Sequence, residues 1–485
     1  MNKQETVINV GEVRDEEKME VNKAVHFSDA EMATIRRGIR KADFRVIPIM
    51  YLLYLASAMD RGNVGTAMIN GMVQKLNLSP ADQGNVTSLL FVTYIALEPF
   101  SNVLLKRTRP SIWFPILSIG WAIACMCLAA ATNATQAIII RLIIGGFEAG
   151  FTPGLITYMA YWYTREELGP RMSIMFSALP ASGIVNLLYG ALVLIKINNL
   201  IPYQSIFIFG GLLTLLVGIA SIFMIQDYPE QVKFLTEEER ALIVKRLNAS
   251  QGSAAKSRIS IKSIIETLLD WRVWAFALLN MSRNNALSII GFIGPTIIRG
   301  LKYSSSTSTF LTAIVSVIGV IGAVVFAFFF KKTKYWIRIL TLDLFSALSL
   351  AIVAYATNSK LRLAFLFIGG FPIFAVVPIT MSWMSVNSGS TQKRALSSAA
   401  YMMVGSAAGM VTPYLFTTKT APKFVTGYAY AFSLYGVSLI MVFLLTVSFK
   451  RANKQRDSNP KDVSHLSSEE QRAMHDFHPN FRYMI

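Results

Sequence analysis

Stretches of about twenty mostly apolar residues recur along the whole chain, and this pattern constrains the fold more than any other feature. A helix of that length rises about 30 Å, which is the thickness of the hydrocarbon core of a bilayer. Of the 485 residues, 53% are hydrophobic and 15% are charged, whereas a soluble chain carries about 25% charged residues. The sequence therefore predicts an all-α protein that crosses a membrane many times.

We expect twelve transmembrane helices in two six-helix halves, separated by a polar central loop. The approximate limits of the spans are 45–66, 83–105, 111–131, 136–160, 172–195, 203–225, 272–298, 308–330, 335–357, 361–386, 395–417 and 426–449. This divides the chain into a tail (1–44), a first bundle (45–225), the central loop (226–270), a second bundle (271–449) and a second tail (450–485). Apolar residues at helical spacing after Leu235 predict a surface helix in the central loop.

The formal net charge of +18 is distributed mainly over one set of loops. Lysine and arginine cluster before the first span, after the second span and after the eighth, whereas the loop after the third span has neither. Because cytoplasmic loops carry the positive excess, we expect both termini and the central loop in the cytoplasm. The basic balance is explained in this way, without a nucleic-acid partner, for which the chain has no recognisable module.

The two halves resemble each other at a nearly constant separation of about 220 residues. Residues 59–63 (MDRGN) match residues 281–285 (MSRNN), and residues 143–154 (IIGGFEAGFTPG) match residues 367–378 (FIGGFPIFAVVP). An even number of spans in each half leaves the two copies in the same orientation, related by an axis along the membrane normal. Transporters built in this way bind substrate between the halves and rock them to open on alternate sides.

Charged residues inside the apolar spans are the first candidates for function, because a charge at mid-membrane costs at least ~2.5–3.5 kcal/mol. At 1.5 Å per residue, Asp60 and Arg61 lie about 22 Å into the first span and Arg141 lies at a similar height in the fourth. Glu148, close to the midplane, shares a helix face with Arg141, and Arg283 lies near the middle of the seventh span. The expected cavity therefore contains both fixed cations and titratable acids.

We expect Asp60 to pair with Arg141, while Arg61 or Arg283 holds a substrate carboxylate through its planar fork of donors. Burial penalises the ionised form of Glu148, so its protonation would free Arg141 and couple proton binding to anion binding. Glu148 is therefore a predicted proton-coupling residue. Further candidates are the substrate ligands Asn63, Asn284 and Tyr94, and the inner-gate residues Glu98, Lys106, Arg107, Asp343 and Lys331.

Each of these residues also has a purely structural interpretation. Buried ion pairs form networks that serve stability alone, asparagines hydrogen-bond one helix to another, and an aromatic residue in a span is by default a packing residue. No phosphate-binding loop or nucleophile elbow is present, and the four histidines lie in the tails. The sequence thus predicts no enzyme, no metal site and no cofactor.

Three motifs resemble one transporter family. Residues 59–67 (MDRGNVGTA) are similar to the LDRxNIGxA signature of the anion:cation symporters within the major facilitator superfamily. Residues 98–113 (EPFSNVLLKRTRPSIW), and residues 141–154 with 161–171 (YWYTREELGPR), resemble its fungal allantoate-permease branch. The resemblance covers residues of about 40 to 450. It implies that the acids matching Asp60 and Glu148 serve proton coupling and gating, and that the matching arginines handle anions.

Together these features predict a monomeric, multi-pass secondary transporter in the plasma membrane of a fungus, with the vacuolar and endoplasmic-reticulum membranes as alternatives. Its expected partners are protons, the lipid bilayer and a small organic carboxylate similar to allantoate, nicotinate or pantothenate. An exporter or organellar carrier with the same fold is a second interpretation. A nutrient receptor that binds without transport is a third, disfavoured by the short second tail.

Overall fold

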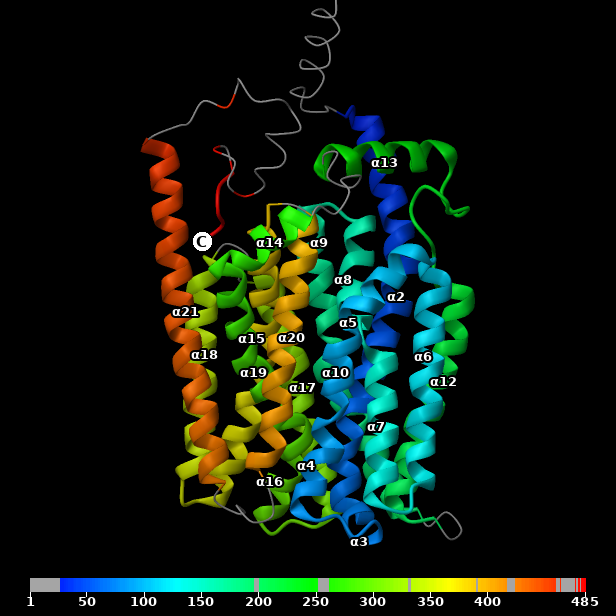
Figure 1. The fold of residues 1–485 in the computed structure, drawn as a ribbon, viewed down its shortest axis with the longest axis vertical. Coiled ribbons are helices and arrows are strands. Elements are labelled where there is room, and N and C mark those ends of the chain that lie inside the picture. The colour runs from blue at the N-terminus through cyan, green and yellow to red at the C-terminus, as the bar shows by residue number, and fades with distance from the viewer. Residues whose placement is uncertain are drawn as a thin grey trace, which may run out of the picture.

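The computed structural model describes residues 27–195, 200–251, 261–329, 333–389, 391–416, 424–458, 463, 476, 479 and 481–485. Throughout this part of the chain the regular structure is helical, and no strand occurs. Long helices run side by side through the molecule, and α13 (Glu237–Gln251) lies across one end (Figure 1). This end is called the α13 end, and the opposite one, where α3 (Val73–Lys75) lies, is called the α3 end.

The first group of helices comes from the first half of the chain. It consists of α2 (Asp29–Ala67), α4 (Pro80–Ser88), α5 (Leu90–Arg107), α6 (Pro110–Cys127), α7 (Ala134–Glu148), α8 (Phe151–Trp162), α9 (Arg165–Phe176), α10 (Ala178–Ile184), α11 (Asn186–Leu194) and α12 (Pro202–Met224). Within it, α12 packs on α6 and α2, and α7 packs on α5 and α6.

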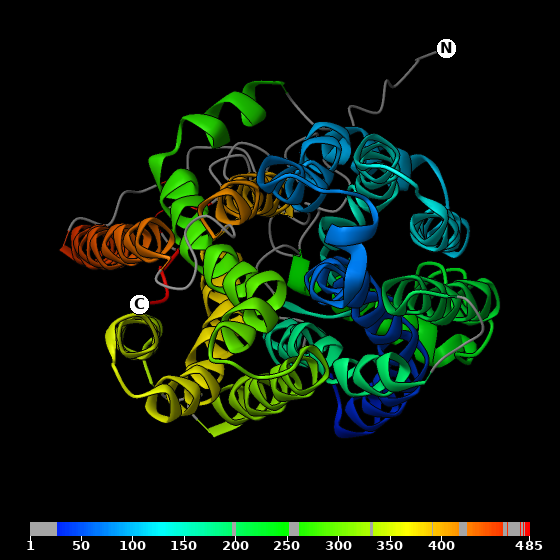
Figure 2. The same ribbon diagram turned by 90° about the horizontal axis from the view of Figure 1, so that it is seen from below.

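The second group follows the polar segment that contains α13. It consists of α14 (Ile261–Leu269), α15 (Trp271–Ser288), α16 (Gly294–Gly300), α17 (Ser305–Phe329), α18 (Tyr335–Tyr355), α19 (Ser359–Val386), α20 (Thr391–Leu415) and α21 (Val425–Ser458). Here α15 packs on α20 and α21, and α19 packs on α17 and α18. Seen along the helices, the two groups lie on opposite sides of the molecule (Figure 2).

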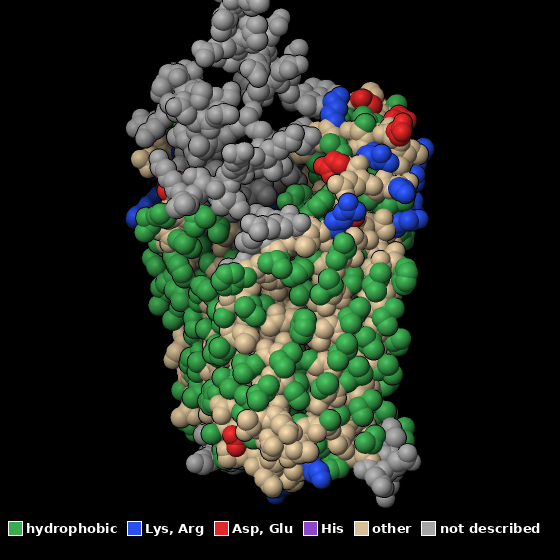
Figure 3. Space-filling view, turned by 45° about the vertical axis from the view of Figure 1, so that its right-hand side comes forward, with side chains coloured by type: hydrophobic (Ala, Val, Ile, Leu, Met, Phe, Trp, Pro, Cys, Tyr) green, Lys and Arg blue, Asp and Glu red, His purple; other side chains and the backbone are tan. Residues whose placement is uncertain are grey.

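The predicted all-helical membrane fold is confirmed. Nine helices within the described residues are long and apolar enough to cross a membrane. The predicted spans 83–105, 272–298 and 395–417 correspond to α4–α5, to α15 with α16, and to α20, so the count of twelve remains a prediction. A broad apolar surface separates the ends of the molecule, and charged side chains gather over α13 (Figure 3).

Helix α12 illustrates how the sequence positions a helix against both lipid and protein. Leu212, Leu216, Ile219 and Phe223 form one exposed apolar face at the i, i+4, i+7 spacing of a helix. The buried face includes several small residues, among them Gly211, where an added Cβ would clash with Met126 and the Ala122 carbonyl of α6. Small residues let transmembrane helices approach closely, and this contact holds α6 and α12 together.

The fourth predicted span, 136–160, is broken into α7 and α8 directly after Glu148. Gly150 adopts a left-handed conformation, with φ of 74°, which glycine reaches without a steric penalty. It also lies against Ser101 of α5, so that a Cβ would clash with the serine side chain. The break places Glu148 at the last residue of α7, inside the bundle.

The surface helix predicted in the central loop is confirmed as α13. Its buried residues Ile243 and Leu247 face α2, and Glu239 forms an ion pair of 2.8 Å with Lys41. Burial alone would raise the pKa of Glu239, but the hydrogen bonds from Lys41 and Thr236 outweigh it and lower the pKa below its ordinary value. The ion pair therefore helps to hold α13 on α2 at neutral pH and is lost as the pH falls below this depressed pKa.

Residues 481–485 pack into the α13 end of the second group. The Tyr483 ring stacks on Phe449 of α21, with the ring centroids 4.6 Å apart. The Met484 carbonyl accepts hydrogen bonds of 2.8 Å from the Trp383 indole and 3.0 Å from the Asn387 amide, both on or directly after α19. These contacts tie α19 to α21.

The close packing of α7 on α5 gives a matched pair of stability predictions. In Gly145→Ala the new Cβ would overlap the Leu90 carbonyl oxygen, and such overpacking costs about 1–3 kcal/mol. In Gly146→Ala the nearest atom is the flexible Leu97 Cδ1 at 3.4 Å, and alanine gains about 0.5–1 kcal/mol over glycine in a helix. Thermal unfolding in detergent should show a lower melting temperature for Gly145→Ala only. Equal melting temperatures would contradict the packing described here.

Candidate functional site

Asp60 is fully buried on α2 and faces α6 and α12. Its carboxylate accepts hydrogen bonds from Thr214 Oγ1 at 2.8 Å, from Asn63 Nδ2 at 3.3 Å and from Cys125 Sγ at 3.5 Å. The prediction that Asp60 pairs with Arg141 is wrong for this conformation, because Asp60 points to the hydroxyl and thiol of neighbouring helices. Arg141 acts on Asp60 only as a charge at longer range.

Arg61 forms the ion pair that connects α2 to α7. Its Nε lies 3.0 Å from Glu148 Oε2, and its Nη2 donates to Ser57 Oγ at 2.6 Å. The guanidinium carbon lies 5.7 Å from the centroid of the Tyr94 ring on α5, within the range of a cation–π interaction. The Glu148 side chain is fully buried, whereas 20% of the Arg61 side chain is exposed.

Arg141 is the buried cation on α7 that the sequence places on the same face as Glu148. It is 2% exposed, and its Nε and Nη1 make no hydrogen bond to any described residue. Glu148 and Asp60 are the acids whose charges act on it. Buried guanidinium donors without hydrogen bonds are costly, so Nε and Nη1 of Arg141 are available to an anion that enters this part of the bundle.

Arg283 and Asp343 form a second buried ion pair, between α15 and α18. Arg283 Nη2 lies 2.9 Å from Asp343 Oδ2, and both side chains are almost fully buried. Ser438 of α21 donates to the same carboxylate oxygen at 2.7 Å and accepts a hydrogen bond from Arg283 Nη1. The prediction of Asp343 as an inner-gate residue does not agree with this conformation, because Asp343 pairs with Arg283 and the two charges neutralise each other.

The expectation of Arg61 or Arg283 as a free carboxylate ligand also needs correction. Both guanidinium groups are paired in this conformation, Arg61 with Glu148 and Arg283 with Asp343. Either can bind an anion only after its acid is protonated or moves away. Arg141 is instead the buried arginine whose Nε and Nη1 lack hydrogen-bond partners among the described residues.

The predicted polar ligands are split between the two groups. Asn63 donates to Asp60, Asn284 donates to the Asn280 carbonyl at 3.5 Å, and Tyr94 lies beneath Arg61. Glu98 on α5 is buried, and neither of its carboxylate oxygens has a hydrogen-bond partner within the described part of the chain. Lys331 lies outside the described residues, as do the side chains of Lys106 and Arg107, so the inner gate remains a prediction.

Sequence reasoning missed Thr214, Ser438 and Tyr401. Thr214 and Ser438 each donate to a buried carboxylate from the last long helix of their group, and their separation matches that of the other repeated residues. The internal repeat could therefore have identified Thr214 and Ser438. Tyr401 on α20 is buried, its hydroxyl has no partner among the described residues, and it lies in the electrostatic range of Arg283 and Tyr54.

At the α3 end, polar contacts join the two groups. Asn70 Nδ2 lies 3.5 Å from Thr309 Oγ1, and Arg299 Nη1 donates to the Ile69 carbonyl at 3.1 Å. Ser88 Oγ donates to the Met410 carbonyl at 2.7 Å, which joins α4 to α20. These contacts close the interface between the groups on that side.

Residues 50–413 match the family described as Major Facilitator Superfamily. A relative from Emericella nidulans, the major facilitator-type transporter hxnP, is 27% identical over 86% of both chains. A putative tartrate transporter of Agrobacterium vitis is 29% identical over 87% of this chain and 94% of that protein. A bacterial homologue of the human lysosomal transporter Spinster, in an inward-facing and occupied conformation, has the same fold, with a TM-score of 0.55 and 14% identity over 83% of this chain and 94% of that chain.

These features define a multi-pass membrane transporter and not an enzyme. The chain belongs to the major facilitator superfamily.

The buried Arg283–Asp343 pair gives a stability prediction. Removing one partner leaves a buried charge uncompensated, which costs about 3–5 kcal/mol. We therefore expect Arg283→Met and Asp343→Leu each to lower the melting temperature in detergent strongly. The double variant leaves no unpaired charge and should melt closer to the parent. A double variant as unstable as the sum of the two single changes would contradict the pairing.

Proposed function

We propose that this protein is a proton-coupled symporter that imports a small organic carboxylate by alternating access. The observation that carries the proposal is the ion pair between Arg61 and Glu148, in which a partly exposed guanidinium is held by a fully buried acid. Protonating Glu148 removes the negative charge that occupies Arg61. The guanidinium then has a fork of donors for a substrate carboxylate, so the proton and the anion favour each other's binding.

Arg141 gives the same region a second positive charge. Its buried, unpaired donors lie on the helix that ends with Glu148, and they would stabilise an anion drawn towards α7. Asp60 is the second candidate for protonation, because its partners within the described part of the chain are Thr214, Cys125 and Asn63, none of which is a cation. Tyr94 would contribute its ring face and hydroxyl beside the substrate.

The class of substrate follows from these cations and from the motif resemblance. Two arginines in a buried site select anions, and the planar guanidinium favours carboxylates. Tartrate, named for a bacterial relative, is a dicarboxylate, whereas the fungal branch that the motifs resemble favours allantoate-, nicotinate- or pantothenate-like acids. A panel of these compounds in an uptake screen is the direct way to identify the substrate.

Alternating access requires the α3-end contacts to break in the opposite state. The basic loops predict that the α13 end faces the cytoplasm, so the conformation described here would be closed towards the outside. We place the protein in the plasma membrane as a monomer. Proteoliposomes with an inward acid gradient test the direction of coupling, since uptake that is indifferent to the gradient would reject symport.

Replacing the proposed proton carrier should separate exchange from accumulation. Glu148→Gln keeps the shape of the side chain but holds it neutral, so Arg61 is always available to the anion. We expect the variant to lose acid-driven accumulation and to retain counterflow exchange in proteoliposomes. The matched control Glu238→Gln alters an exposed acid on α13 and should behave as the parent. Equal loss of exchange and accumulation in Glu148→Gln would contradict a coupling role.

Removing the proposed anion ligand should act on affinity. A charge-assisted hydrogen-bond pair contributes about 1.5–3 kcal/mol, which is about 10–100-fold in affinity. Arg61→Ala is therefore expected to raise the KM for uptake by at least about tenfold. Arg482→Ala, which removes an exposed surface arginine, serves as the control. Unchanged uptake kinetics in Arg61→Ala would exclude Arg61 from the substrate site.

A further inference from the structure

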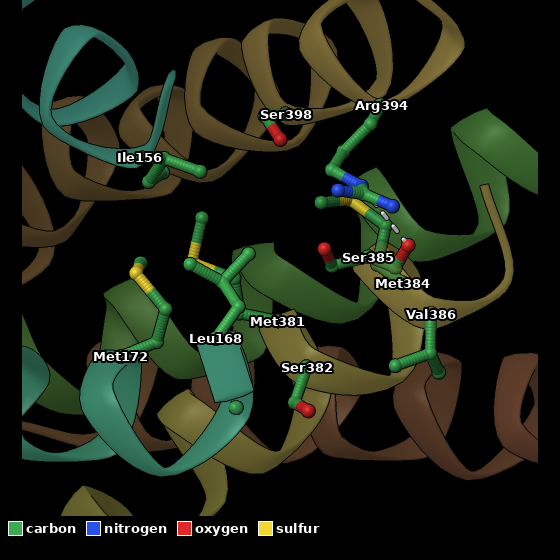
Figure 4. Close-up of a pocket in the computed structure, with 11 residues that line it drawn as sticks. Ile156, Leu168, Met172, Met381, Ser382, Met384, Ser385, Val386, Arg394 and Ser398 are labelled. Carbon is green, nitrogen blue, oxygen red and sulfur yellow. Dashed lines mark hydrogen bonds between the residues drawn. The ribbon is translucent and has the colours of Figure 1, made fainter. Parts of the chain in front are cut away.

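A separate pocket lies between the two helix groups near the α13 end. It offers about 460 Å³ of space, a volume that includes open solvent at its mouth, and it is lined by residues of α8, α9, α19 and α20. Apolar side chains form most of the wall, among them Met172, Met381 and Met384 (Figure 4). Arg61, Arg141, Glu148 and Arg283 do not line it, so this pocket is distinct from the site proposed for the transported substrate.

Two polar side chains of α20 line the same pocket. Arg394 is 7% exposed, and its Nε donates to the Ser385 carbonyl at 3.3 Å, which fixes the position of the guanidinium. Ser398, one turn further along the helix, is 2% exposed, and its hydroxyl has no hydrogen-bond partner among the described residues. Figure 4 shows both side chains directed into the pocket. A buried hydroxyl without a partner costs free energy that a bound acceptor would recover.

We propose that this pocket is a second binding site, for a small carboxylate that carries an aromatic body. The Arg394 guanidinium supplies positive charge, and the Ser398 hydroxyl donates a hydrogen bond to the carboxylate. The three methionines supply polarisable sulfur atoms, which contact aromatic rings favourably. A mostly apolar pocket with a few convergent polar groups is the usual form of a small-molecule site.

Both helix groups contribute to the walls of the pocket, so ligand binding depends on the conformation of the protein. Ile156, Leu168 and Met172 belong to the first helix group, whereas Met381, Arg394 and Ser398 belong to the second. A ligand that touches both groups binds only when they have the separation that they have in this conformation. It therefore stabilises this conformation by its differential affinity and slows transport without competing for the Arg61 site.

Calorimetric titration of the purified full-length protein in detergent with phenylacetate tests the site. Acetate lacks the ring and phenylacetamide lacks the charge, so both are expected to bind at least about tenfold more weakly than phenylacetate. Equal binding of phenylacetamide would overturn the role of Arg394. Absence of phenylacetate binding at millimolar concentration would overturn the proposal.

Variants place the ligand within the protein. Ser398→Ala should weaken phenylacetate binding about fivefold, the effect of one hydrogen bond, and Arg394→Gln at least about tenfold. Ser349→Ala removes another buried serine hydroxyl without a partner, outside this pocket, and should leave the affinity unchanged. Full affinity in Ser398→Ala would overturn the assignment even if Arg394→Gln failed to fold.

Measurements on Arg61→Ala distinguish failure of the second site from failure of the proposed function. If phenylacetate occupies the second site, Arg61→Ala raises the KM for the transported substrate but retains phenylacetate affinity. Loss of phenylacetate binding in Arg61→Ala would place the ligand at the central site and overturn the second site, while leaving the proposed symport intact. Unchanged uptake kinetics in Arg61→Ala would count against the proposed function alone.

Discussion

The attraction between opposite charges that are removed from water organises the interior of this protein. Desolvating an ion costs several kcal/mol, and a well-placed partner recovers most of that cost. The Arg61–Glu148 pair connects α2 to α7, and the Arg283–Asp343 pair connects α15 to α18. Each pair fixes the rotation of its helices about their axes, because the side chains meet in only one orientation.

The two pairs differ in their surroundings, and this difference bears on function. Asp343 is held by Ser438 as well as by Arg283, in a pair that is almost fully buried. Arg61 is partly exposed and lies over an aromatic ring, and the unpaired Arg141 is close enough to act on the same acid. The second pair therefore has the character of a structural lock, whereas the first has an accessible cation and a neighbouring one that is still unsatisfied.

Helix packing determines where these charges lie. Gly145 allows α7 to approach α5 closely, and Gly150 ends the helical path just after Glu148. A broken helix inside a membrane protein is tolerated where it lies within the bundle or lines a cavity. The acid is thus presented at a helix end, surrounded by α2 and α5, rather than along a continuous helix surface.

The sequence predicted the helical fold and the surface helix after the first group, because these follow from apolar length and periodicity. Asp60 and Arg61 point in different directions, since neighbouring helical residues are about 100° apart. The sequence could not predict which of the two residues faces α7, because the rotation of α2 is set by tertiary contacts such as Thr214 with Asp60. The same limit hid the partnership of Arg283 with Asp343, which depends on two helices far apart in the chain.

Four charged residues of the candidate site in the first group also determine an electrical balance. Asp60, Arg61, Arg141 and Glu148 sum to zero when both acids are ionised, and one added proton leaves a surplus of one positive charge. A bound monoanion cancels that surplus, so reorientation of the loaded carrier would move no net charge across the membrane. Moving one unbalanced charge across the membrane changes the free energy by about 2.3 kcal/mol per 100 mV. For the proposed symporter, the voltage dependence of uptake therefore reports how many protons are carried for each negative charge on the substrate.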